Sequence, residues 1–333
     1  MPTRPTTIEE LHRAATGDPA HDVPWDPADP RTVLVVDLDS LEPGDATAPI
    51  DTAIGAVVVG TTADPVAAIA DGRAAVCDLA VACGDLDSIV ATVEACPVAA
   101  ASFVLLLRAS GSRSVDDGLH AESAVYSTLQ AGTEFTAWRQ QREVRQREAQ
   151  DGDAVVVERD GDTLTLTLNR PTVRNALNTA LRDQLLSGLA LSHTDATITE
   201  VHLRGAGPAF CSGGDLDEFG SFPDPARAHL VRLSTSIGRS IDRIRDRVVV
   251  HLHGPCAGSG IELPAFAGTV TADPATTFDL PEVSLGLIPG AGGTVSLPRR
   301  IGRHRTAELG LRGAPIDATT ARRWGLVDAI EPR

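Results

Sequence analysis

The chain has 333 residues, which suffices for about two ordinary domains, and it carries a formal net charge of −16. A surface this acidic disfavours nucleic acid and anionic lipid as partners. The five cysteines are odd in number and include no C-x-x-C pair, so neither a disulfide framework nor a structural zinc site is expected. The longest apolar stretch, Val98–Leu107, is too short to span a bilayer. We therefore expect a soluble, cytoplasmic protein without a metal, a nucleic-acid partner or a membrane partner.

Residues 1–30 are rich in Pro, Asp and Ala, and they predict a short helix followed by an irregular N-terminal arm. Residues 31–96 predict a small, degenerate β-α unit in which continuous apolar runs form buried strands. The strands are expected at Val33–Val36, Ile54–Val59 and Ala74–Ala82, with a helix at Pro65–Gly72.

Residues 97–150 change to a helical pattern, and we refer to this segment as the helical cap. Ser114 is placed to cap the second of its helices, with Asp117 three residues later as the acidic first-turn partner. The expected helices are Ala99–Leu107, Val115–Ala131 and Glu134–Ala149.

Residues 151–333 predict a second, larger α/β domain. It opens with a hairpin, because Asp160-Gly-Asp separates two alternating runs. The expected elements are strands at Ala154–Arg159, Thr163–Leu168, Glu200–Arg204 and Val248–Leu252, a helix at Thr179–Leu191, and one long helix at Ala226–Arg245.

Two glycine-rich loops of this domain have the composition of a catalytic site. The loops at 207–220 and 254–262 each follow a strand, and their glycines allow sharp turns that expose backbone N–H groups. Glu262 closes the second loop just inside a helix, where the macrodipole favours its ionised form. Glu282 lies in the next glycine-rich segment. Amides beside carboxylates can stabilise a developing oxyanion while protons move.

Five segments in this order resemble the crotonases, the enoyl-CoA hydratase/isomerase superfamily. The resemblance covers about residues 154–331 and is carried by Leu168–Leu177, Phe210–Leu216, Gly254–Leu263, Phe278–Thr294 and Gly313–Asp328. It implies an α/β fold with a crotonase-like ββα spiral core. The N-terminal α/β unit and the helical cap would be additions to that core.

The resemblance also implies roles for individual residues. The N–H groups of Gly214 and Ser259 would form the oxyanion hole. Glu262 and Glu282, 20 residues apart, would be the two catalytic carboxylates. Family members take a coenzyme A thioester as substrate, need no other cofactor, and form homo-oligomers, as trimers or hexamers. The residues implied in binding substrate and coenzyme A are Arg174, Ala176, Asp215, Leu216, Asp217 and Gly290.

Two carboxylates favour hydration of a 2-enoyl-CoA. One would activate water and the other would donate a proton, because two neighbouring carboxyl groups do not both ionise easily and one of them stays protonated. Members that only isomerise a double bond commonly keep the later carboxylate alone. Gly258–Ala267 is also similar to a cofactor-free arylacetyl-CoA dioxygenase branch. Ser259 in place of a usual glycine, with Pro264 nearby, leaves open a non-catalytic subunit that binds CoA esters or assists assembly.

The helical cap contains a further resemblance. Gly118–Arg139 is similar to the C-terminal region that crotonases carry after the segment found here at Gly325–Asp328. We hypothesise that the cap supplies this region from the N-terminal side, as in a permuted chain. Residues 31–96 would then be the remnant of a second crotonase-like unit. The alternative is an unrelated helical linker.

The remaining polar residues have simpler interpretations. The pair His251 and His253 is interpreted as packing, as is Tyr126. Cys211 and Cys256 adjoin no basic partner in sequence, which disfavours a nucleophilic thiol. An arginine cluster could bind a polyanionic ligand or form a solvated helix face; its members are Arg299, Arg300, Arg303 and Arg305.

Overall fold

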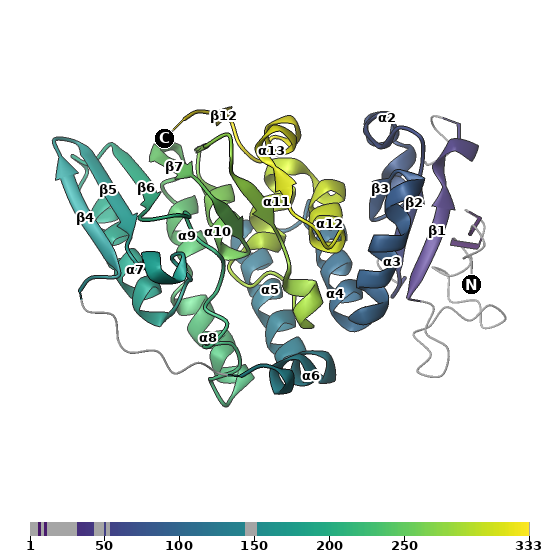
Figure 1. The fold of residues 1–333 in the computed structure, drawn as a ribbon, viewed down its shortest axis with the longest axis horizontal. Coiled ribbons are helices and arrows are strands. Elements are labelled where there is room, and N and C mark those ends of the chain that lie inside the picture. Colours follow the sequence, from purple (N-terminus) through teal and green to yellow (C-terminus); the bar gives the residue numbers. More distant parts are fainter. Residues whose placement is uncertain are drawn as a thin grey trace.

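The computed structural model describes residues 6–7, 10–11, 32–42, 50, 54–143 and 152–332. Most of the predicted N-terminal arm, residues 1–30, lies outside them. Figure 1 shows a small parallel sheet at one end of the molecule, a larger sheet at the other, and helices between. The expected α/β architecture is confirmed.

The small sheet is parallel, with β2 in the middle. Its apolar strands are buried, as expected for parallel strands covered on both faces. The third strand is shorter than predicted, because Gly72 adopts a left-handed φ of 88° and starts the 3₁₀ helix η2 where a strand was expected. The elements are β1 (Val33–Asp37), η1 (Leu38–Ser40), β2 (Val57–Thr61), α2 (Pro65–Ala70), η2 (Arg73–Val76), β3 (Leu79–Val81), η3 (Cys83–Asp85) and α3 (Leu86–Ala95).

A buried ion pair ties this unit to the helical cap. Arg108, at the end of α4 (Pro97–Arg108), donates to both carboxylate oxygens of Asp78 at 2.8 and 2.7 Å. Their side chains are 1% and 2% exposed. The N–H of Val58 donates to the same carboxylate at 2.8 Å. Asp78 therefore joins β2, β3 and α4 at one point.

The cap continues with α5 (Val115–Gln130) and α6 (Thr133–Gln141). Ser114 caps α5 as predicted, accepting the N–H of Asp117 at 3.1 Å. The third helix is shorter than the predicted Glu134–Ala149, because Arg142 turns to an extended conformation. Residues 144–151 lie outside the described part of the chain. Helix α5 packs on α8 (Pro225–Ser234) and α11 (Gly293–Ile301), and α6 packs on the 3₁₀ helix η7 (Glu282–Leu285), so the cap contacts the larger domain.

The larger domain is built on a six-stranded sheet in the order β12-β9-β7-β6-β5-β4, parallel except for the β4–β5 hairpin. A second sheet has the order β11-β10-β8. The strands are β4 (Val155–Asp160), β5 (Thr163–Leu168), β6 (Glu200–Gly205), β7 (Val248–Leu252), β8 (Pro255–Ala257), β9 (Thr269–Ala272), β10 (Thr277–Asp279), β11 (Ile316–Asp317) and β12 (Ala329–Ile330). The helices are η4 (Pro171–Val173), α7 (Thr179–Thr194), α8 (Pro225–Ser234), α9 (Ile237–Asp242), η5 (Arg245–Arg247), α10 (Ser259–Glu262), η6 (Pro264–Phe266), η7 (Glu282–Leu285), α11 (Gly293–Ile301), α12 (Arg303–Leu311) and α13 (Ala318–Trp324).

The prediction of one long helix at Ala226–Arg245 is wrong. The chain breaks between α8 and α9. The Thr235 hydroxyl donates back to the carbonyl of Val231 at 2.8 Å, and the Ser236 hydroxyl accepts the N–H of Arg239 at 3.2 Å. Such side-chain bonds to the local backbone compete with a continuous helix, and here they end one helix and start the next.

Neither interpretation of the arginine cluster is supported, because its guanidinium groups bind backbone carbonyls. Arg303 donates to the carbonyls of Cys77 and Ala75 at 2.7 and 3.0 Å, and so fixes α12 against the N-terminal unit. Arg299, Arg300 and Arg305 likewise donate to carbonyls, at 2.6–3.1 Å. These arginines hold segments together.

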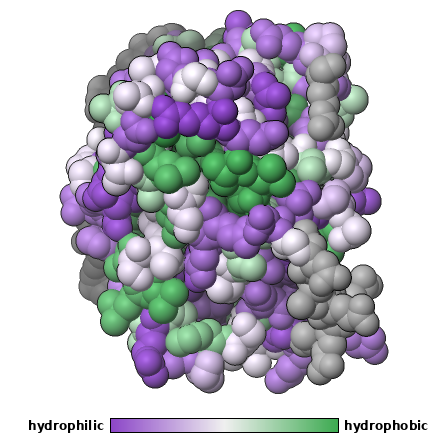
Figure 2. Space-filling model, turned by 90° about the vertical axis from the view of Figure 1, so that its left-hand side faces the viewer, coloured by the Kyte–Doolittle hydropathy of each residue, from purple (hydrophilic) through white to green (hydrophobic). Residues whose placement is uncertain are grey.

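The end of the molecule that carries β4 is shown in Figure 2, where hydrophobic side chains gather in patches between hydrophilic ones. Strand β4 is an edge strand, and its Val156 and Val157 are among the exposed large apolar residues.

Within the described residues no single helix is long and apolar enough to cross a membrane. One helix pair, Cys83–Ala95 with Pro97–Arg108, has the length and composition of a membrane span, but the two helices are bent by 110° relative to each other.

Candidate active site

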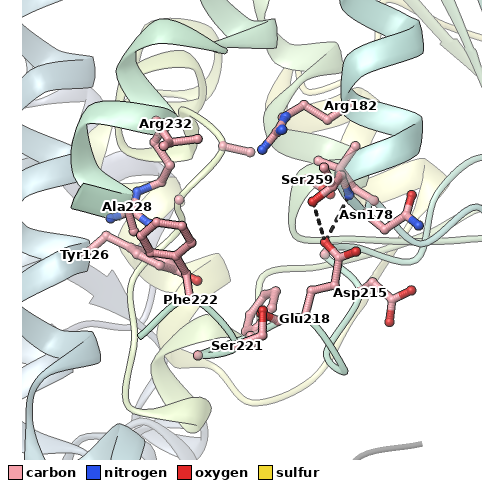
Figure 3. A pocket seen from close by; sticks show the side chains of 18 of the residues that line it. Tyr126, Asn178, Arg182, Asp215, Glu218, Ser221, Phe222, Ala228, Arg232 and Ser259 are labelled. Atoms are coloured by element: carbon pink, nitrogen blue, oxygen red, sulfur yellow. Dashed lines mark hydrogen bonds between the residues drawn. The ribbon is translucent and has the colours of Figure 1, made fainter. Parts of the chain in front are cut away.

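A pocket of about 290 Å³ lies between the cap and the larger domain. It is lined by Tyr126 of α5, by the start of α7, by the 214–222 segment, and by α8. Figure 3 shows these side chains surrounding one cavity. Six of the residues implied by the resemblance line it: Gly214, Asp215, Ser259, Glu262, Glu282 and Gly290.

The two glycine-rich loops meet at this pocket. The N–H of Ala257 donates to the carbonyl of Cys211 at 3.2 Å, which joins one loop to the other. A Cβ on Gly213 would lie 3.2 Å from the carbonyl oxygen of Ala257, so the backbones are in close contact. In the described part of the chain, neither the N–H of Gly214 nor that of Ser259 donates to a backbone or side-chain acceptor. Both N–H groups can therefore serve a ligand oxygen in the pocket.

Glu262 is the last residue of α10 and is 2% exposed. One of its oxygens, Oε2, accepts the N–H groups of Ala291 and Gly293 at 2.8 and 2.9 Å. Burial raises the pKa of Glu262 to about 7, although both N–H donors act to lower it. The helix end was predicted to favour the ionised form of Glu262; burial acts in the opposite direction and has the larger effect on its pKa.

Glu282 opens η7 and is also buried. Its Oε1 lies so close to Gly258 that a Cβ there would be 2.3 Å away. Its Oε2 is buried and has no hydrogen-bond partner among the described residues. Burial, and then the charge of Glu262, raise the pKa of Glu282 well above its ordinary value of 4.5. The surroundings of Glu282 therefore favour its protonated form.

Sequence reasoning missed a third buried carboxylate, Glu122 of α5, which is 2% exposed. Its oxygens accept the N–H groups of Gly292 and Thr294 at 2.7 and 2.8 Å, together with the Thr294 hydroxyl at 2.7 Å. Burial and the charge of Glu262 raise its pKa to about 8. The only signal was its place in the segment that resembles the C-terminal region of crotonases.

Tyr126 does more than pack within the cap, which was its predicted role. Its ring lies in the pocket wall, with the guanidinium of Arg232 4.6 Å from the ring centroid. A Cβ on Gly290 would lie 2.6 Å from Tyr126 Cε2, so the glycine allows this close approach.

Four of the implied coenzyme A-binding residues are not among the described residues that line the pocket. Arg174 is exposed and adopts a left-handed φ of 51°. Ala176 accepts a hydrogen bond from Arg170, which also pairs with Asp215 at 3.2 Å. Asp217 pairs with Arg142 at 3.2 Å, and Leu216 is half-buried beside it.

The cysteines and histidines near the two glycine-rich loops have surroundings typical of residues that pack in a core. Burial raises the pKa of the Cys256 thiol to about 12 and also raises that of Cys211. The Nε2 atom of His251 lies 3.1 Å from Nδ1 of His202, and Nε2 of His253 lies 3.1 Å from the carbonyl oxygen of Gly207. Among the described residues no group of His, Cys, Asp or Glu could hold a metal ion.

A family model described as enoyl-CoA hydratase/isomerase matches residues 158–333, which is more than half of the chain. The chain belongs to this family, the crotonase superfamily. It is accordingly an enzyme of the enoyl-CoA hydratase/isomerase type.

Individual relatives agree with this membership. The 2,3-dehydroadipyl-CoA hydratase of Escherichia coli (strain K12) is 34% identical over 178 residues, which are 54% of this chain and 69% of that protein. The 1,2-epoxyphenylacetyl-CoA isomerase of the same organism is 36% identical over 49% of this chain and 64% of its own length. The crystal structure of enoyl-CoA hydratase from Thermoplasma volcanium GSS1 superposes with a TM-score of 0.51 at 32% identity, covering 55% of this chain and 73% of that one.

Proposed function

We propose that this crotonase adds water across the double bond of a 2-enoyl-CoA thioester, giving a 3-hydroxyacyl-CoA. The observation that carries the proposal is the pair Glu262 and Glu282, two buried carboxyls that line one pocket beside two available backbone N–H groups. The chemistry as proposed requires only side chains, backbone amides and water.

The thioester oxygen binds the N–H groups of Gly214 and Ser259. As water attacks C3, the electrons of the double bond move toward this oxygen, and the two N–H groups stabilise the enolate. Loss of one such donor typically costs about 3 kcal/mol of barrier.

The different environments of the two acids support a different role for each. Glu262, with a pKa of about 7 and two N–H donors on Oε2, is the carboxylate that removes a proton from water as its oxygen bonds to C3. Glu282, whose pKa is raised well above 4.5, is the acid that donates its proton to C2. Each turnover consumes one water and returns both carboxyls to their starting states once a proton passes from Glu262 to Glu282. Splitting the pKa values of paired acids is how a site runs both steps near neutral pH.

Steady-state hydration of crotonyl-CoA by the wild type, E262Q and E282Q tests this proposal. Each variant should lose about 10²- to 10⁴-fold in kcat, the usual contribution of a positioned acid or base. E218Q is a matched control, because Glu218 also lines the pocket but bonds Thr179 of α7. If E262Q and E282Q keep wild-type rates, the proposal is wrong.

Double-bond isomerisation is the second candidate, favoured by the isomerase among the relatives. It needs one proton shuttle and no water. Loss of activity in E282Q alone, on an isomerisable substrate, would identify it. If the protein instead belongs to the dioxygenase branch, it should take up oxygen with an arylacetyl-CoA. If it is a non-catalytic subunit that binds CoA esters, it should turn over no enoyl-CoA.

That the protein forms a homo-oligomer stays a prediction from the family resemblance.

A further inference from the structure

Two arginines line the pocket without a role in the chemistry above. Arg182 of α7 and Arg232 of α8 are both half-buried, and both line the 290 Å³ pocket. They also line a second cavity of about 150 Å³ that shares Leu177, Gly290 and Ala291 with the first. The arginines therefore stand where the two cavities meet.

Arg232 brings a positive charge that no neighbouring acid neutralises. It donates to the Ser123 hydroxyl at 3.2 Å and to the Gln130 amide oxygen at 3.4 Å, and also to Ser127. All of these partners are neutral, and no carboxylate in the described part of the chain forms an ion pair with it. Glu122 also lines the second cavity, and burial raises its pKa to about 8, which favours its neutral form. A guanidinium held this way favours an anionic ligand.

Arg182 is held only loosely. Its guanidinium pairs with the adjacent Asp183 at 2.8 Å, and the Asp183 side chain is 55% exposed. Exposed ion pairs of this kind contribute little, so exchange for a ligand carboxylate costs little. Figure 3 shows the Arg182 guanidinium reaching from α7 toward the α8 side of the pocket, where Arg232 lies.

The second cavity indicates which part of a substrate meets these arginines. Its walls come from α5, α7, α8 and the α8–α9 junction, with the hydroxyl-bearing residues Ser123, Thr235 and Ser236 among them. At about 150 Å³ it can hold a short tail but not the nucleotide of coenzyme A. On the opposite side of the view in Figure 3 lie Glu218 and Ser221. An acyl tail that extends from a thioester at Gly214 and Ser259 would enter the space that both arginines line.

Building on the proposed function, we propose that Arg182 and Arg232 select acyl-CoA thioesters whose acyl chain ends in a carboxylate. The tail carboxylate accepts charge-assisted hydrogen bonds from the two guanidinium groups. The apolar middle of the chain lies against Phe222 and Val231, which line the same pocket.

Matched pairs of enoyl-CoA substrates test the selectivity. Each pair has the same carbon count, with a methyl or a carboxylate at the end. The wild type should show about tenfold or higher kcat/KM for the carboxylate member. R182Q and R232Q should each lower this carboxylate-to-methyl ratio about tenfold. R227Q is the matched control, because Arg227 is an exposed arginine of α8 outside the residues described as lining either cavity, and it should leave the ratio unchanged.

Binding of saturated analogues separates this inference from the proposed function. Calorimetric Kd values for ω-carboxyacyl-CoA and plain acyl-CoA of equal length need no turnover. A carboxylate preference that R182Q removes supports the inference even if no enoyl-CoA is hydrated. Equal Kd values for both analogues overturn it. A loss in R182Q that is the same for both analogues also overturns it, because the arginine then contacts the coenzyme A part. R182Q keeps the test decisive if R232Q fails to fold, because among the described residues the Arg182 guanidinium pairs with the exposed Asp183 alone.

Discussion

Glu122 and Glu262 bind alternate N–H groups of one turn. Glu262 accepts those of Ala291 and Gly293, and Glu122 accepts those of Gly292 and Thr294. One acid comes from the helical cap and the other from the second glycine-rich loop. The N-terminus of α11 therefore fixes both carboxylates, and the cap takes part in the electrostatics of the site.

This relationship predicts a shifted pH profile for E122Q. Above about pH 8 Glu122 ionises, and its negative charge helps to raise the pKa of Glu282. Glutamine stays neutral, so the pKa of Glu282 should be lower. The high-pH limb of kcat, where Glu282 loses its proton, should then move to lower pH. E134Q is the control, because Glu134 also accepts two backbone N–H groups, those of Val98 and Ala99, but lies outside the site. An unmoved limb in E122Q would contradict the coupling.

Folding stability should depend on pH through the same acids. The pKa of Glu262 rises on folding from 4.5 to about 7, and that of Glu122 to about 8. The protonated forms therefore favour the folded state, fully so below pH 4.5, and this contribution is lost as the pH rises through 7 and 8. Urea unfolding should give a smaller free energy of unfolding at pH 8 than at pH 5, with a shallower decrease in E122Q. A free energy that rises over this window would rule out the raised pKa values.

Gly258 should tolerate no side chain. Its φ is 49°, and a Cβ would lie 2.3 Å from Glu282 Oε1. G258A should displace this carboxyl and lower kcat about a hundredfold, since a 1 Å misplacement can have that effect. In G84A the new Cβ meets nothing within 4 Å, so its kcat should equal that of the wild type. Equal rates for the two variants would show that Glu282 need not occupy this position.

The Asp78–Arg108 pair should matter for stability. D78N leaves the buried guanidinium of Arg108 without its counter-charge, which typically costs about 3–5 kcal/mol. D71N removes a partner of Arg73 from a more exposed ion pair and should change stability much less. Chemical denaturation measures both. A D78N variant as stable as D71N would mean that the N-terminal unit and α4 are not joined through this pair.

Local patterns predicted much of the fold. The hairpin of β4 and β5, the Ser114 cap and the apolar strands follow from neighbouring residues, and the structure confirms them. The break at Thr235-Ser236 was missed, because hydroxyl bonds to the backbone decide it and an apolar pattern does not show them.

Site residues that lie within contiguous sequence motifs were predicted. The site residue that comes from a segment distant in sequence was missed. The sequence placed Glu262 and Glu282 in neighbouring segments, and both line one pocket. Glu122 reaches Gly292 across 170 residues, and no local signal encodes that contact. The raised pKa of Glu262 could not be predicted from its place at a helix end, because it is caused by burial, which depends on the whole fold. The domain boundaries and the permuted origin of the cap stay predictions.

Hydration in ¹⁸O-labelled water tests the central claim most directly. A single turnover of crotonyl-CoA by the wild type should give 3-hydroxybutyryl-CoA that carries one ¹⁸O at C3, while E262Q and E282Q give almost none in the same time, as measured by mass spectrometry. Wild-type turnover that moves the double bond without taking up ¹⁸O, or labelling that persists in both variants, would contradict the account.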